Sequence, residues 1–200
     1  MLRSPATLLL PLALLALSGC IEESTLPGDE VLGTFAFNAS LVPGNNCPAG
    51  EVSDAGIAFD GTLTRESEGG RAYFVVSGFA RDAGFDGQRV SSVQRASQPG
   101  YMPSCGSTCT AVEVEQTLRL LLLSSSQNEL YGKDKSCAEL LDGGLPADGG
   151  AQPPGRGADG GFDAVRACGD MVNLKLPDAG CTCTPCTWAY SVEGTPRVGN

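Results

Sequence analysis

Short segments in which apolar and polar residues alternate recur along the chain, and they constrain the fold more than any other feature. A two-residue period is typical of a β-strand with one buried face. In residues 31–41 the apolar side chains occupy every second position: Phe35, Phe37, Ala39 and Leu41. The following Pro43-Gly44-Asn45-Asn46 is typical of a turn. We therefore predict a strand that ends at this turn.

The clearest strand pattern lies in residues 111–123. One face would carry the apolar residues Val112, Val114, Leu118, Leu120 and Leu122. The other face would carry Glu113, Glu115, Thr117 and Arg119. A helical period would mix the two sets on one face, so the pattern favours a strand.

Further strands are predicted at residues 57–66, 71–80, 88–96, 171–176 and 187–192. The first two flank a Gly-Gly turn and predict a β-hairpin. Residues 82–87 are rich in Asp and Gly and are predicted as a turn, and residues 134–141 as a short helix that holds Cys137. Because short strands recur without a βαβ rhythm, we expect a mainly β fold. An antiparallel β-sandwich stabilised by disulfides is preferred to a barrel.

Residues 143–161 consist mostly of Gly, Pro, Ala and Asp and are predicted to form a mobile surface loop or linker. The two strands after this stretch either complete the main sheet or form a separate C-terminal hairpin. We prefer the first arrangement, which makes residues 31–200 a single β-rich domain.

The N-terminus has the pattern of an export signal. Arg3 is the only charge before Cys20, and residues 6–17 are almost wholly apolar and are interrupted by Pro11. This is a charged region followed by an apolar region of signal-peptide length, too short for a spanning helix of roughly 20 residues. We expect residues 1–19 to be a helical signal peptide and the polar residues 20–30 to be a tether.

The apolar run ends in Leu17-Ser18-Gly19-Cys20, which resembles the lipobox of bacterial lipoproteins. The resemblance implies cleavage before Cys20, diacylglycerol on its sulfur and acylation of the new N-terminus, so the partner would be a lipid bilayer. Ile21 in place of Asp implies export to the outer membrane. The Ala-, Gly-, Pro- and Arg-rich composition is similar to that of proteins from GC-rich, for example myxobacterial, genomes. Ordinary secretion with Cys20 as an incidental thiol is the alternative.

The chain has nine cysteines, and removal of Cys20 leaves an even number. The remaining cysteines are Cys47, Cys105, Cys109, Cys137, Cys168, Cys181, Cys183 and Cys186. Because an exported chain meets an oxidising compartment, we predict up to four disulfides, with the 105 possible pairings left open. Zinc bound by the C-terminal cysteines with Cys168, or redox chemistry at the Cys183–Cys186 motif, are alternatives. Structural bridges to different partners are preferred.

Composition excludes several functions. The formal net charge of −10 argues against nucleic-acid binding. The chain has no histidine, which excludes Ser-His-Asp and Cys-His catalysis and histidine-based zinc hydrolases within it. The recurrent Asp-Gly pairs are good turn residues, with calcium binding as an alternative. We expect no enzymatic activity, no cofactor and no metal.

The sequence thus predicts an envelope lipoprotein with a structural or binding role. One alternative is a module that binds a glycan or an envelope protein through exposed Trp188, Tyr190 or Tyr101. Another is a carboxylate hydrolase that uses Glu113 and Glu115, whose backbone positions would lie roughly 7 Å apart on one strand face. Arg119 on the same face would offset the charge of these two glutamates.

Overall fold

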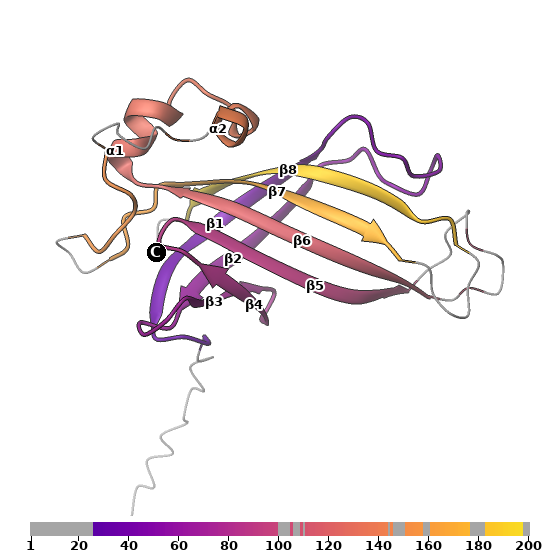
Figure 1. Ribbon diagram of the computed structural model, residues 1–200, viewed down its shortest axis with the longest axis horizontal. Coiled ribbons are helices and arrows are strands. Elements are labelled where there is room, and N and C mark those ends of the chain that lie inside the picture. The colour runs from indigo at the N-terminus through magenta and orange to yellow at the C-terminus, as the bar shows by residue number, and fades with distance from the viewer. Residues whose placement is uncertain are drawn as a thin grey trace, which may run out of the picture.

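The fold is a closed barrel of eight antiparallel strands in sequence order, as a computed structural model shows (Figure 1). The structure describes residues 26–99, 105, 109, 111–143, 145, 151–157, 161–176 and 183–197. The strands are β1 (Glu30–Leu41), β2 (Ile57–Arg65), β3 (Arg71–Val76), β4 (Phe79–Phe85), β5 (Arg89–Pro99), β6 (Ala111–Leu123), β7 (Arg166–Lys175) and β8 (Cys186–Pro196). Between β6 and β7 lie three short helical elements, α1 (Ser125–Gln127), the π-helical turn η1 (Asn128–Gly132) and α2 (Cys137–Gly143). None of the helices in the described residues is long and apolar enough to span a membrane.

The predicted β-sandwich is wrong, because the first and last strands pair and close the sheet. Phe35 to Leu41 of β1 lie opposite Pro196 to Tyr190 of β8, while the other edge of β1 pairs with β2. The strands β7 and β8 therefore complete the main sheet and do not form a separate module. Sandwiches and barrels both bury one face of each strand, so alternation alone does not distinguish them.

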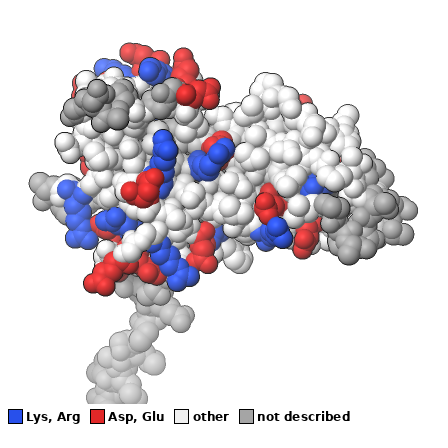
Figure 2. Space-filling view, viewed as in Figure 1, with Lys and Arg blue, Asp and Glu red and all other residues white. Residues whose placement is uncertain are grey.

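The apolar face of every strand points into the barrel. Phe37 lies at its centre, with ring centroids of Phe35, Phe59 and Phe74 at 5.7, 5.2 and 5.6 Å. The outer face carries ion pairs such as Arg95–Glu115 and Arg119–Asp170. Figure 2 shows basic and acidic side chains lying next to one another over this face.

A second, smaller core lies outside the barrel under α2. Its buried members are Leu121, Leu123, Cys137, Leu140 and Cys168. Leu121 and Leu123 point outward from β6, and the disulfide Cys137–Cys168 joins α2 to β7. The C-terminal end of β6 is thus apolar on both faces because it contacts two cores.

The predicted strand at residues 71–80 is two strands. Ser77 and Gly78 have φ values of 51° and 81°, which fit a two-residue hairpin turn between β3 and β4. The predicted turn at residues 82–87 is wrong, because β4 continues to Phe85. The turn follows at Asp86, whose Oδ1 accepts hydrogen bonds from the backbone N–H groups of Gln88 and Arg89 at 3.0 and 2.6 Å.

The strands β4 and β5 share the shortest ladder of paired residues in the barrel. These strands share only the pairs Gly84–Ser91 and Phe85–Val90, whereas β5 pairs with β6 along its whole length. Beyond the two pairs, the hydroxyl of Ser92 donates to the carbonyl of Asp82 at 2.7 Å. In Figure 1, β5 and β6 extend past the tip of the β3–β4 hairpin. Phe79 at this tip is 76% exposed although its register directs it inward.

The two ends of the barrel are closed differently. At the end where β1 begins, here called the helix end, Glu30 pairs with Arg65 and Arg156. The Arg65 guanidinium also lies over the rings of Phe85 and Phe162, at 5.3 and 5.8 Å. Arg156 belongs to the low-complexity stretch, so this part of the stretch contacts the barrel.

At the opposite end, here called the loop end, residues 42–56 between β1 and β2 fold over the opening. The disulfide Cys47–Cys186 ties this segment to the start of β8. Glu51, further along the same segment, pairs with Lys175 at the end of β7.

Candidate functional site

A cavity of about 210 Å³ lies inside the barrel at the loop end. Its lining comes from strands on opposite sides of the barrel and from the 42–56 segment: Glu51, Val52, Ser53, Ile57, Gln116, Met171, Asn173, Trp188 and Tyr190. The cavity reaches the surface at Ser53 and Ile57, which are both exposed. An eight-stranded barrel is just wide enough to be filled by side chains or to hold one small ligand.

A belt of polar side chains crosses the barrel interior at the level of the cavity. Gln94 lies opposite Gln116 in the β5–β6 register, and Gln116 lies opposite Asn173 in the β6–β7 register. Asn173 in turn lies opposite Trp188 on β8. Because these residues occupy neighbouring positions on adjacent strands, their side chains form one continuous row, here called the polar belt.

Hydrogen bonds connect the polar belt to a cation on β4. A guanidinium N–H of Arg81 donates to Oε1 of Gln116, and Nε2 of Gln116 donates to Oδ1 of Asn173 at 2.9 Å. The series ends at Asn173, whose Nδ2 is buried and has no hydrogen-bond partner among the described residues. Asn173 as a whole is only 2% exposed.

A buried polar atom without a partner costs roughly 1–3 kcal/mol and calls for an explanation. Asn173 Nδ2 belongs to a residue that lines a cavity, so a ligand or water in that cavity could accept its hydrogen bond. Gln94 Oε1, at the other end of the polar belt, is also buried without a partner, but Gln94 does not line the cavity.

The basic residues Lys175 and Arg81 differ in whether a carboxylate pairs with them. Lys175 and Glu51 form a buried pair with Nζ and Oε2 2.6 Å apart, so this pair contributes no net charge. Within the described residues Arg81 has no carboxylate partner. Burial lowers the pKa of its guanidinium from the usual value, yet arginine stays protonated in proteins. Arg81 is half-buried on β4 and does not line the cavity, so its positive charge lies beside the polar belt and not within the cavity.

Trp188 and Tyr190 form the aromatic wall of the cavity. They are 9% and 5% exposed and lie two residues apart on the inward face of β8. Burial raises the pKa of the Tyr190 hydroxyl above its ordinary value of 10.0.

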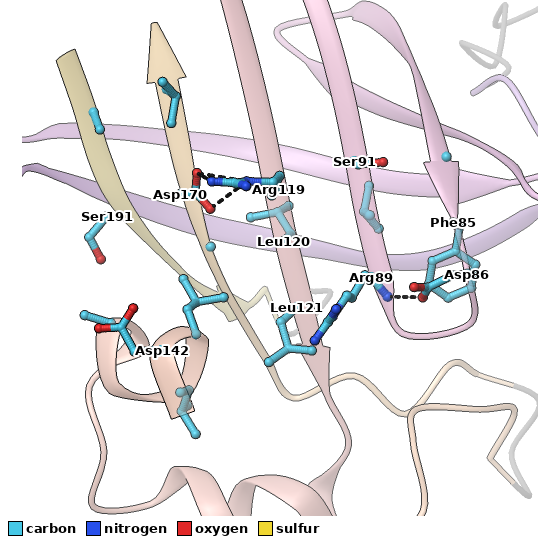
Figure 3. A pocket seen from close by; sticks show the side chains of 18 of the residues that line it. Phe85, Asp86, Arg89, Ser91, Arg119, Leu120, Leu121, Asp142, Asp170 and Ser191 are labelled. Carbon is cyan, nitrogen blue, oxygen red and sulfur yellow. Dashed lines mark hydrogen bonds and ion pairs between the residues drawn. The ribbon is translucent and has the colours of Figure 1, made fainter. Parts of the chain in front are cut away.

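A second hollow is a groove of about 950 Å³ on the outer face of the barrel beside α2. Figure 3 shows strands forming its floor and α2, with Asp142, lying over one side. Its floor carries Arg119 and Asp170; Nε of Arg119 donates to Oδ1 of Asp170 at 3.1 Å and Nη2 donates to Oδ2 at 2.7 Å. Arg119 and Asp170 thus satisfy each other, so neither offers a ligand a free charge.

The disulfide prediction is confirmed for the described cysteines. The bridges are Cys47–Cys186, Cys105–Cys183 and Cys137–Cys168, and Cys109 is also disulfide-bonded. The sulfur atoms of Cys105, Cys109 and Cys183 lie within 4.8 Å of one another, but none of them is a free thiolate. Cys183 and Cys186 belong to two different bridges, as preferred from the sequence, and do not pair with each other. Cys20 and Cys181 lie outside the described residues.

The other predicted site residues do not form a surface site. Trp188 and Tyr190 are buried, which contradicts their predicted exposure, and Tyr101 lies outside the described part of the chain. Glu113 and Glu115 point away from the barrel interior and line neither hollow. Glu115 pairs with Arg95 at 2.8 Å. Arg119 offsets the charge of Asp170 instead of the two glutamates.

Sequence reasoning missed Gln116 and Asn173. Gln116 interrupts the apolar series of β6 between Val114 and Leu118, on the face that points inward. A polar residue at a core position of an otherwise regular strand was the available signal. Asn173 lies in the same way between the buried Met171 and Lys175.

No protein-family model, curated protein or solved structure matches the chain.

Proposed function

We propose that this protein is a lipid-anchored component of the bacterial cell envelope whose barrel binds a small ligand reversibly, without chemical change. The observation that carries the proposal is the buried amide of Asn173, left without a partner in a cavity that has an aromatic wall. Ligand sites in proteins combine apolar and aromatic surface with a few oriented polar groups, as this cavity does.

The position of the chain start supports an anchored binding role. The chain enters the barrel at Glu30 on the helix end, and the cavity lies near the other end of β1, roughly 35 Å along the strand. A tether that leads from an acylated Cys20 to Glu30 places the bilayer at the helix end. The cavity opening would then face away from the membrane surface.

The buried positions of Trp188 and Tyr190 favour an interior site over a glycan- or protein-binding surface. These two residues were the aromatic anchors expected for a surface site, and both face the cavity. We therefore place the binding role in the barrel interior.

The ligand-binding proposal is tested on the full-length protein purified from membranes with mild detergent. Solvent extraction followed by mass spectrometry should recover a stoichiometric small molecule, or added ligands should change the emission of Trp188, the only tryptophan. The variant Trp188→Phe controls for ligand absorbance. Absence of both an extracted molecule and any emission change across a chemically broad ligand panel would overturn the binding role.

The anchor is tested separately by intact-mass analysis of the exported protein. We expect a chain that begins at Cys20 and carries acyl mass, and a Cys20→Ser variant that lacks this mass and leaves the membrane fraction. An exported wild-type chain without acyl mass would contradict the anchor and would leave the cavity argument unaffected.

A further inference from the structure

The direction of the hydrogen bonds in the polar belt is fixed by Arg81. A guanidinium has only donors, so the Gln116 oxygen must face Arg81 and its NH₂ group must face Asn173. Asn173 accepts that bond with Oδ1, and its NH₂ group is thereby left as the free end. An amide flip at Asn173 would place two NH₂ groups against each other. The unsatisfied group at the cavity is therefore a donor.

A donor at the end of this series requires a ligand that offers an acceptor. The charge balance narrows the acceptor further, since Glu51 and Lys175 neutralise each other while Arg81 has no carboxylate partner in the described structure. Arg81 is half-buried and does not line the cavity, so its charge acts on the acceptor only through Gln116 and Asn173. The polar belt favours an anion over a neutral acceptor, because a bond from Arg81 polarises Gln116 and then Asn173.

The remaining lining residues indicate the polarity and size of the rest of the ligand. Trp188, Tyr190, Met171 and Ile57 offer apolar and aromatic surface. The volume of about 210 Å³ is below the roughly 300–1,000 Å³ of sites for drug-sized molecules. The ligand must therefore be small.

We propose that the cavity binds a small monocarboxylic acid as its anion, with a carboxylate oxygen accepting a hydrogen bond from Asn173 Nδ2. Its apolar body lies against Trp188 and Tyr190. Arg81 and Gln116 act as positioning residues, which orient Asn173 without touching the ligand. This inference deepens the proposed binding function and rests on it.

The test compares matched probes that differ only in the acceptor. The full-length protein is stripped of bound molecules and titrated with 3-phenylpropanoate and with its neutral amide, 3-phenylpropanamide, and likewise with hexanoate and hexanamide. Binding is read from Trp188 emission and from calorimetry. We expect each carboxylate to bind about tenfold or more tightly than its amide, because charge-assisted hydrogen bonds are roughly twice as strong as neutral ones.

Three variants connect this selectivity to the polar belt. Asn173→Asp, a near-isosteric change, replaces the donor with a carboxylate and should abolish the preference for the anion. Arg81→Met should reduce the carboxylate-to-amide ratio toward one, and Arg81→Lys should restore part of it, a readout that a loss of stability alone would not produce. Glu115→Gln, on the outer face next to Gln116 in sequence, is the matched control and should bind like wild type.

The possible outcomes separate this inference from the binding function itself. Equal affinity for acid and amide, or an unchanged ratio in Asn173→Asp, overturns the carboxylate assignment while the barrel remains a binding protein. Recovery of a neutral molecule from the purified protein would also overturn the carboxylate assignment and leave the binding function in place. If none of the four probes binds, the assignment is wrong, and Asn173 donates to water.

Discussion

Nζ of Lys175 lies 2.6 Å from Oε2 of Glu51, and the two side chains are 0% and 2% exposed. The pair joins the end of β7 to the segment that covers the loop end of the barrel. When two charges are removed from water in this way, loss of either one leaves the other as a buried charge whose desolvation is no longer compensated.

Loss of one partner of this pair should therefore be costly. Lys175→Met leaves Glu51 as a buried charge without its main counter-ion, and we expect a loss of about 3–5 kcal/mol in the free energy of unfolding. The double variant Glu51→Gln/Lys175→Met should regain most of this loss. Urea unfolding of the oxidised protein measures both, with Arg95→Met as a control that breaks an exposed pair and should cost about 0–1 kcal/mol. Equal losses in the single and double variants would contradict the account.

Glu30 should make stability depend on pH in the acid range. Hydrogen bonds from Arg65 and Arg156 lower its pKa below the ordinary value of 4.5. A carboxyl whose pKa is lower in the folded state stabilises the fold when ionised. This contribution is fully present above pH 4.5 and is lost as the pH falls through the folded-state pKa. The stability difference between wild type and Glu30→Gln should thus be constant near neutrality and shrink below this value; a difference that grows in acid would show the opposite sign.

The Cys137–Cys168 bridge closes a loop with a sequence separation of 31 residues and holds α2 on the outside of the barrel. The paired variant Cys137→Ala/Cys168→Ala should lose about 3–4 kcal/mol from the greater freedom of the unfolded chain. Because α2 lies outside the main core, we expect the far-ultraviolet circular dichroism of the barrel to persist. Collapse of the β signal at room temperature would mean that α2 is part of the main folding unit.

Gly169 and Gly84 form a matched pair of glycines within strands. A Cβ at Gly169 would lie 2.1 Å from the backbone oxygen of Arg119, whereas a Cβ at Gly84 would meet only the Ser91 hydroxyl at 3.6 Å. Gly169→Ala must displace a neighbouring strand and should cost about 1–3 kcal/mol or more. Gly84→Ala should be neutral or stabilise by up to about 1 kcal/mol, through a less flexible unfolded chain. Thermal unfolding of both variants tests this contrast.

The strands themselves could be predicted, because their two-residue period is a local property. The pattern in residues 31–41 and 111–123 directs Phe35, Phe37, Leu118 and Leu120 inward, and all four are buried. Closure could not be predicted in this way. It depends on pairing between β1 and β8, which lie at opposite ends of the sequence, and the burial pattern of neither strand records its neighbour.

The errors in detail have local physical reasons. Asp82, Ala83 and Gly84 have low β propensity, so β4 resembled a turn. The start of β4 was missed because apolar residues lie on both sides of Ser77-Gly78, so that residues 71–80 resembled a single strand. The cavity was missed because the sequence does not show that Gln116 and Asn173 are neighbours; this depends on the register of β6 and β7.

The short seam between β4 and β5 has a consequence for how the barrel moves. Beyond Ser91, β5 forms no further ladder pair with β4 in the described part of the chain, and the β3–β4 hairpin is held mainly through β2. Hydrogen exchange should be fastest on this side of β5 and slowest along β6 and β7, which are paired on both edges. We therefore expect the barrel to open first between β4 and β5, where the fewest ladder pairs must separate.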